Sequence, residues 1–315
     1  MYVQYLLTSF SHSTGTAVAH TPPPAEERLI DPLPESSLIG LPLINRMMPS
    51  NTNAPLFTQL KIAVIPAQST TIHQAKLYKL ASHLQDRLGV PVYLDIAETY
   101  DDAIALIVNE QVDLAYLGAL SYIQAKAQNP QIEPLVAAIS QGTGRPWSTS
   151  VILTSSQSHI NSLADLQDKR FGFVSQSSTS GYLAPIAQFK TMDQMPNFSE
   201  VIYAGDHDSN VALLMAQKVD AIGINKSTFS ALEHENEAFN GQCTILWESE
   251  PIPNEPIVAA GTLTEQQRIE IQKVLLDTPE GLVDVRGIAA LGYTLVQDRD
   301  YDSIRNIQTI LSKAK

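Results

Sequence analysis

The chain has 315 residues, of which 44% are hydrophobic and 17% are charged, and its formal net charge is −13. This length and hydrophobic content suffice for two globular domains, and the longest apolar stretches have the length of strands rather than of membrane spans. So acidic a surface repels phosphate backbones, which excludes nucleic acid as a partner.

Residues 1–59 differ from the rest in being rich in proline and small polar residues, and we interpret them as a flexible leader. The start, Met1 to Phe10, contains no Lys or Arg and only a short apolar piece, while Ala17-Val18-Ala19 fits a cleavage site weakly. No Cys lies near the start to carry a lipid anchor. We expect a periplasmic or cell-envelope location, although the sequence contains no clear signal peptide.

Beyond residue 59, short β-rich runs alternate with segments of helical periodicity, a pattern typical of βα units on a mostly parallel sheet. Strands are predicted at residues 60–65, 91–97, 113–117, 135–139, 150–154, 171–174, 201–203, 220–225, 244–248 and 256–260. Helices are predicted at residues 73–88, 101–109, 181–190, 209–217 and 264–277. The fold class is therefore α/β.

Two irregular stretches, residues 141–146 and 250–254, interrupt this alternation. If the chain crosses between lobes there, residues 60–146 and 250–315 form lobe 1 and residues 147–249 form lobe 2. Two crossings make a hinge, and the cleft between hinged lobes is a favoured ligand site. The alternative is one larger doubly wound domain with two loops.

Residues 177–181 read Ser-Ser-Thr-Ser-Gly and stand between an apolar run, 171–174, and a helix-forming segment. The first N–H groups of a helix have no internal partner and the helix dipole is positive there, so such a turn is suited to binding an oxyanion. The hydroxyls add further donors. The competing interpretation is an ordinary Ser or Thr N-cap, which needs no ligand.

Other chemistries find little support. The single cysteine, Cys243, lies in an apolar run and is interpreted as a buried strand thiol. The seven histidines form no spaced cluster, so we expect no metal site, and no phosphate-binding glycine motif of a nucleotide or dinucleotide fold occurs, so we expect no cofactor.

Several segments, in this order, resemble the phosphonate-binding PhnD-like family, the substrate-binding components of ABC transporters for phosphonates, phosphite and phosphate. They are LGVPV at 88–92, VDLAYLGALSY at 112–122, STSGYLAP at 178–185, AGDH at 204–207 and PIPNEPIV at 251–258. The resemblance runs from about residue 60 to the end. It implies a type II periplasmic-binding fold, with two α/β lobes joined by a two-crossing hinge that close over the ligand.

The resemblance also implies roles for particular residues. Ser178, Thr179 and Ser180, the Ser-Thr-Ser turn, match the family's motif that holds phosphonyl oxygens, and His207 matches the histidine that follows the family's Ala-Gly. Asp206 departs from the family pattern. Tyr100 matches an aromatic position near the ligand.

Further polar side chains are assigned to the same cleft. Tyr116 lies in the strand-end motif, where Leu117 replaces a tyrosine of some members. Ser69 and Thr70, between the first strand and helix, could add contacts from the other lobe or simply form a polar turn with an N-cap. Asn225, at a strand end, could bind the ligand or cap the next helix.

Acidic positions decide the choice of ligand. Members that take aminoalkyl phosphonates place two carboxylates around the ammonium, whereas here Glu255 fits one place and Ser227 occupies the other. A buried ammonium with one carboxylate is poorly compensated, so a compact anion such as phosphite, methylphosphonate or phosphate is favoured. Glu255 could instead accept a hydrogen bond from a protonated ligand oxygen.

The sequence thus favours a protein that is not an enzyme and delivers a small phosphorus oxyanion to the permease of an ABC transporter. Two alternatives stay open at this point. A soluble sensor would use the same closure to signal, and an enzyme could arise if folding brought His207 and Ser178 together. No nucleophile has a visible paired base in the sequence, which favours binding over catalysis.

Overall fold

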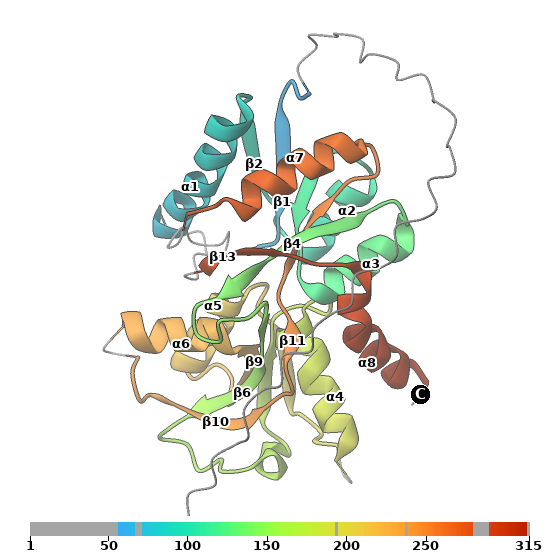
Figure 1. Cartoon of the computed structure of the whole chain (residues 1–315). Coiled ribbons are helices and arrows are strands. Elements are labelled where there is room, and N and C mark those ends of the chain that lie inside the picture. Colours follow the sequence, from blue (N-terminus) through green and yellow to red (C-terminus); the bar gives the residue numbers. More distant parts are fainter. Residues whose placement is uncertain (1–55, 67–70, 193–194, 237–238, 280–289, 314–315) are drawn as a thin grey trace, which may run out of the picture. The chain divides into compact units, whose positions relative to one another are not determined.

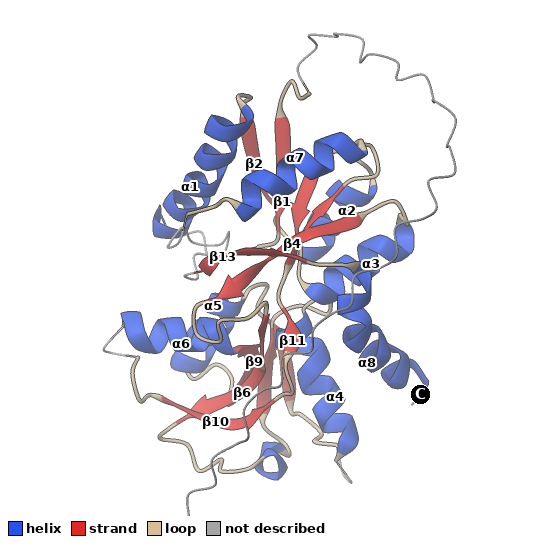
Figure 2. Cartoon of the chain, in the orientation of Figure 1, coloured by secondary structure: helices blue, strands red, loops and turns tan. Residues whose placement is uncertain are grey.

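The computed structural model describes residues 56–66, 71–192, 195–236, 239–279 and 290–313. All of them belong to one compact unit, Ala54–Lys315. The predicted leader, residues 1–59, lies outside the described residues except for its last four positions. Helices pack against two mixed sheets, as Figures 1 and 2 show.

The first sheet has six strands in the order β13-β4-β12-β3-β1-β2. Strands β1, β2 and β3 run parallel, while β12 pairs antiparallel with β3 and β4, and β13 antiparallel with β4. The strands are β1 (Leu60–Val64), β2 (Val92–Ile96), β3 (Leu114–Tyr116), β4 (Glu133–Ser140), β12 (Pro256–Ala259) and β13 (Ala290–Leu295). Its helices are α1 (Thr71–Leu88), α2 (Tyr100–Val108), α3 (Ala119–Gln128) and α7 (Glu265–Leu276).

The second sheet has five strands in the order β10-β6-β9-β7-β8. They are β6 (Ser150–Ser155), β7 (Arg170–Phe173), β8 (Glu200–Tyr203), β9 (Ala221–Asn225) and β10 (Cys243–Glu248). The accompanying helices are the 3-10 helix η1 (Leu163–Leu166), the π-helical turn η2 (Thr179–Leu183), α4 (Ala184–Thr191), α5 (His207–Met215) and α6 (Lys226–Glu235). Strand β7 runs parallel to both of its neighbours, β8 and β9, as the βα pattern predicts.

The chain passes between the sheets twice. Strand β5 (Trp147–Ser148) lies between β4 and β6, and β11 (Ile252–Pro253) lies between β10 and β12; the two pair antiparallel. Asn254 fastens this region, because its N–H donates to Pro146 O at 2.9 Å and its side-chain amide to Ala138 O at 2.8 Å. The predicted lobe boundaries, which place these segments at a hinge, stay a prediction.

The predicted elements agree with the structure in most places. No range was predicted for helices α3, α6 and α8 (Asp302–Lys313), for strand β13 or for the short strands β5 and β11, and the predicted helix 181–190 begins instead with the π-turn η2. In this turn Leu183 N donates to Ser178 O at 3.1 Å, while the Gly181 carbonyl accepts from Val174 N at 3.1 Å, outside the helix. This contact back to the strand end holds the first turn away from α-helical geometry.

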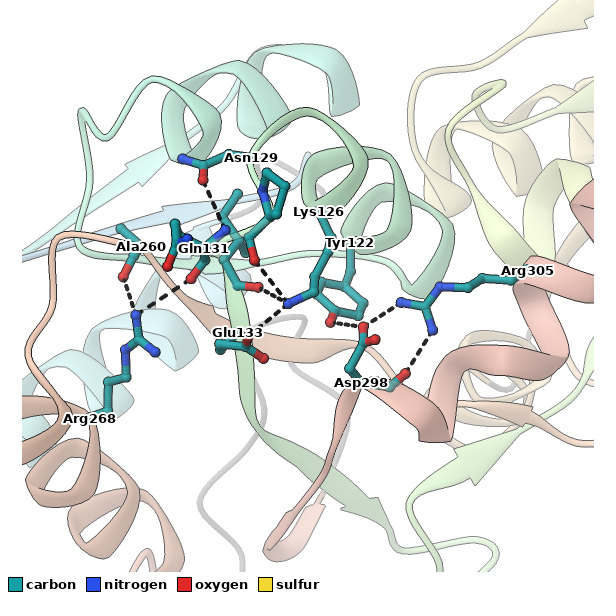
Figure 3. A network of polar contacts seen from close by, with 11 residues as sticks. Tyr122, Lys126, Asn129, Gln131, Glu133, Ala260, Arg268, Asp298 and Arg305 are labelled. Carbon is teal, nitrogen blue, oxygen red and sulfur yellow. Dashed lines mark hydrogen bonds and ion pairs between the residues drawn. The ribbon is translucent and has the colours of Figure 1, made fainter.

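The C-terminal helix α8 (Asp302–Lys313) and the 3-10 turn η3 (Asp298–Tyr301) are attached to α3 by a polar network (Figure 3). Tyr122 Oη and Arg305 Nη2 both donate to Asp298 Oδ1. Lys126, one turn further along α3, donates to Glu133 Oε1 at 2.8 Å. Helix α8 also contacts α4 and η2, so the network fixes one helix that touches elements of both sheets.

Replacing Asp298 by Asn tests this attachment. Partial burial acts to raise the pKa of Asp298. The hydrogen bonds from Tyr122 and Arg305 nevertheless hold this pKa below its usual value. We expect D298N to lower the free energy of unfolding at pH 7 by about 1 kcal/mol, because both donors lose a charged acceptor that is partly exposed.

The sign of the pH dependence follows from the lowered pKa. The contribution of Asp298 to stability is present above its unfolded-state pKa and is lost as the pH falls through the folded-state value. Urea denaturation of both proteins should therefore show a difference that shrinks from about pH 5 to about pH 2. Asp95→Asn on the exposed side of β2 serves as control, and a D298N difference independent of pH would contradict the attachment.

Candidate functional site

The Ser-Thr-Ser turn connects the end of β7 to α4. All three residues are buried, with 2% exposure for Ser178, 7% for Thr179 and 4% for Ser180. Ser178 is the N-cap of η2, and its Oγ accepts a hydrogen bond from Gly181 N at 3.1 Å. The capping interpretation is therefore correct for Ser178. A side chain at Gly181 would place its Cβ 2.4 Å from Val174 Cγ2, so the turn requires glycine there.

Helix α3 of the six-stranded sheet begins against this turn. Its N-cap, Gly118, has no side chain to satisfy the first N–H groups of the helix. Thr179 caps the helix instead, because its Oγ1 accepts a hydrogen bond from Leu120 N at 2.8 Å. Tyr100 lies beside them, because a Cβ built on Gly118 would stand 3.9 Å from Tyr100 Cε1 and 4.0 Å from Thr179 Oγ1.

A second chain of contacts joins Ser180 to His207. Ser150 Oγ donates to Ser180 O at 2.7 Å, and Ser150 is paired with Asn225 in the β6–β9 ladder. Asn225 N in turn donates to His207 Nδ1 at 3.3 Å. His207 and Asn225 are thus brought to the same end of the sheet as the Ser-Thr-Ser turn, with 7% and 3% exposure.

Asn225 is also the N-cap of α6. Its Oδ1 accepts from Ser227 N at 2.8 Å and from Ser148 Oγ at 3.0 Å, while the hydroxyls of Ser148 and Ser227 lie 2.9 Å apart. Of the two interpretations of Asn225, the cap is therefore observed. Ser227, which stands where the resemblance places a second carboxylate, is part of this hydroxyl network.

Tyr116 and Glu255 belong to the six-stranded sheet, the first in β3 and the second directly before β12. Tyr116 ends β3 two residues before Gly118 and is 1% exposed. Glu255 is half-buried and directly precedes Pro256, whose carbonyl accepts from Leu117 N at 3.2 Å. Burial first, and then the charge of Glu255, raise the pKa of Tyr301 well above its usual value, which places the carboxylate near that buried phenol.

The remaining predicted site residues, Ser69 and Thr70, lie outside the described residues. Sequence reasoning assigned no role to Leu120, Ser121 or Ser150, which hold the Ser-Thr-Ser turn in place. The available signal was Gly118 before an apolar run with helical spacing. A glycine N-cap leaves N–H groups that another part of the chain has to satisfy.

The side chains of this site share one electrostatic feature. Ser178 Oγ, Thr179 Oγ1 and His207 Nδ1 each accept a hydrogen bond from a backbone N–H group. The hydroxyl hydrogens are left to be donated, and the imidazole, if neutral, must carry its proton on Nε2. The ammonium group of Lys226, the residue after Asn225, donates a hydrogen bond to Glu248 Oε1 at 2.7 Å. The arrangement therefore offers neutral donors, which suit an anion.

Two cavities are lined in part by described residues of the five-stranded sheet and its helices. A cavity of about 520 Å³ is lined by Ser148 and Ser227 together with Lys226 and Glu248, and so borders the Asn225 network. A surface cavity of about 600 Å³ on the five-stranded sheet is lined by Arg170 and Asp220 and contains none of the predicted site residues. The first cavity is not lined by a predicted site residue either, but Ser148 and Ser227 connect its wall to Asn225 by hydrogen bonds.

Within the described part of the chain, no cluster of three or more His, Cys, Asp or Glu could hold a metal ion. No helix found there is long and apolar enough to cross a membrane. Cys243 is half-buried, and burial, followed by the charge of Glu233, raises the pKa of its thiol to about 11. The thiol is consequently protonated at neutral pH and poorly nucleophilic.

Comparison with known proteins gives relatives along most of the chain. The model of one family, described as the periplasmic substrate-binding protein of phosphonate ABC transporters, matches residues 62–301. The phosphate-import protein PhnD of Mycolicibacterium smegmatis is 25% identical over 290 residues, covering 85% of this chain and 90% of its own. The phosphonates-binding periplasmic protein of Escherichia coli is 28% identical over 232 residues, covering 70% of this chain and 67% of its own.

Solved structures share the fold. PhnD1 of Prochlorococcus marinus in complex with methylphosphonate aligns with a TM-score of 0.72 at 23% identity, over 81% of this chain and 99% of that one. The binding component of an ABC phosphonate transporter from Pseudomonas aeruginosa gives a TM-score of 0.73 at 19% identity, over 81% and 87%. These likenesses confirm the predicted periplasmic-binding fold. Because the family model spans most of the two sheets, the chain belongs to the family of periplasmic substrate-binding proteins of phosphonate ABC transporters.

Proposed function

We propose that this protein binds a small phosphorus oxyanion, such as a phosphonate, phosphite or phosphate, and delivers it to the permease of an ABC transporter in the periplasm or cell envelope. The protein acts by binding and catalyses no reaction. Membership in the substrate-binding family supports this proposal, as do relatives named for phosphate import and phosphonate binding.

One observation carries the choice of an oxyanion: backbone N–H groups fill an acceptor site on Ser178, Thr179 and His207. With one acceptor site filled, each side chain still has a hydrogen that it can donate to a ligand oxygen. An anion with several oxygens meets these donors without reorganisation, which lowers the cost of binding. The N-termini of η2 and α3 add partial positive charge at the same place.

The other predicted site residues complete the proposal. Tyr100 and Tyr116 cover the anion from the six-stranded sheet, and Ser69 and Thr70 add donors from the segment before α1. Glu255 accepts a hydrogen bond from a protonated ligand oxygen. The six-stranded and five-stranded sheets act as lobes that move about β5 and β11, and an anion that contacts both of them favours closure.

Thr179→Val tests the donor role, because valine keeps the shape and deletes the hydroxyl. We expect the affinity for methylphosphonate, measured by calorimetry, to fall about 10- to 100-fold, since a hydrogen bond to a charged group contributes about 1.5–3 kcal/mol. The free energy of unfolding should fall as well, because Leu120 N also loses its acceptor.

Thr179→Ser is the matched control, since it keeps the hydroxyl and both of its hydrogen bonds. Its affinity should stay within about threefold of the parent protein. Equal weakening by the two substitutions, or unchanged binding by T179V, would show that the hydroxyl does not face the ligand.

Selectivity tests the pairing of Glu255 with Ser227. Of the two positions that the resemblance assigns to carboxylates, Ser227 lies in a hydroxyl network and Glu255 alone is acidic, and one carboxylate does not offset the desolvation of a buried ammonium group. In competition titrations we expect methylphosphonate and phosphite to bind more tightly than 2-aminoethylphosphonate. The reverse order would assign the amine to another acidic group, such as Asp206 or Asp208.

The protonation of His207 can be observed directly. Its Nδ1 accepts from Asn225 N, so a proton on Nδ1 would set two donors against each other. In ¹⁵N NMR at pH 7 we expect a neutral ring protonated on Nε2, both alone and with methylphosphonate bound. The signal is assigned by its loss in His207→Asn, with exposed His159 as internal reference. A ring protonated on both nitrogens in the complex would contradict a neutral donor.

A further inference from the structure

Ser177, the residue before the Ser-Thr-Ser turn, has two hydrogen bonds to helices of the six-stranded sheet. Its carbonyl accepts from Ser121 Oγ at 2.8 Å, and its own hydroxyl donates to Asp101 Oδ1 at 2.8 Å. Ser121 lies in the first turn of α3, and Asp101 in the first turn of α2. Ser177 therefore joins the five-stranded sheet to two separate helices of the other sheet.

The placement of Asp101 is unusual for a site that attracts anions. Its carboxylate adjoins Tyr100 and would repel a negative ligand if charge were its only contribution. Its exposure to solvent screens that charge, whereas its hydrogen bond to Ser177 is directional and short-ranged. The position of Asp101 is therefore better explained by the hydrogen bond that its carboxylate oxygen accepts from Ser177 than by its negative charge.

Burial distinguishes the two bonds of Ser177. Ser121 is fully buried and Ser177 is 5% exposed, so the bond between them is shielded from water, while the bond to the exposed Asp101 is only partly buried. Losing the Ser121 hydroxyl leaves a buried carbonyl without that donor, which costs more than losing a partly exposed bond. Both bonds join protein groups and involve no ligand atom, so they act equally on the ligand-free protein.

We infer that Ser121, Ser177 and Asp101 are positioning residues, which hold the Ser-Thr-Ser turn against α2 and α3 and thereby favour the closed arrangement of the two sheets before the anion binds. If a larger fraction of the ligand-free protein is already closed, less free energy is needed to close it on binding. These residues therefore increase affinity without contacting the ligand. The link to affinity rests on the proposed function, while the effect on closure does not.

The test uses spin labels on the two sheets. The single native cysteine is changed to serine, Cys243→Ser, and labels are attached at Lys79→Cys on α1 and Lys218→Cys after α5, both exposed positions. Pulsed electron resonance then gives the distance distribution of the ligand-free protein. We expect Ser121→Ala and Ser177→Ala to broaden this distribution, and saturating methylphosphonate to restore that of the labelled parent.

Asp101→Asn is the matched control, because its side-chain oxygen still accepts from Ser177 while the charge is removed. It should keep the narrow distribution of the parent, whereas Asp101→Ala should broaden it. The affinity for methylphosphonate should fall about 3- to 10-fold in S121A and S177A, in proportion to the closed population lost, and should not fall in D101N.

The outcomes separate the two proposals. If the labelled parent binds none of methylphosphonate, phosphite and phosphate, the proposed function fails, yet the ligand-free distances still test the positioning role. If S121A and S177A leave those distances unchanged, or if D101N broadens them as D101A does, the positioning role is wrong. Thermal unfolding of each variant is measured alongside, because lower stability with an unchanged distribution also overturns it.

Discussion

The candidate site depends on one hydrogen bond between the two sheets, from Leu120 N to Thr179 Oγ1. The N-cap residue of helix α3 is Gly118, which has no side chain to cap it, yet the first turn of the helix is buried and its N–H groups require an acceptor. Thr179 supplies this acceptor from a turn 59 residues later in the chain. The need to cap one helix thus fixes the position of Thr179, which we propose as a ligand-binding residue.

A protein with a net charge of −13 is an unexpected receptor for an anion. The geometry is compatible with an anion, because Ser178 and Thr179 have uncharged hydroxyls and, like His207, each accepts a hydrogen bond from a backbone N–H group. Oriented donors act over a few ångströms, whereas surface charges at longer range are screened by salt. The basic residue next to Asn225, Lys226, is neutralised by Glu248. Binding of this kind selects by geometry more than by charge.

The buried side-chain amide of Asn210 positions the residues of the candidate site that belong to the five-stranded sheet. Asn210 Nδ2 donates to Gly172 O at 3.0 Å and to Gly223 O at 3.1 Å, and so ties α5 to β7 and β9. Its side chain lies so close to β7 that a Cβ on Gly172 would stand 2.3 Å from Asn210 Oδ1. Since His207 is one turn earlier in α5, this amide sets the distance between His207 and the strand that ends in Asn225.

The sequence by itself determined the α/β alternation and the family, because these depend on local periodicity and on short motifs. The anion-binding role of the Ser-Thr-Ser turn stays a prediction from hydroxyls beside a helix start. It could not determine that Thr179 caps α3 or that Ser177 is held by Ser121 and Asp101. Those contacts join residues 56 to 76 positions apart, and only the packing of two sheets brings them together. Helix α3 was not predicted although Gly118 and the apolar run after it are visible in the sequence, because the acceptor that satisfies its first turn comes from a distant part of the chain.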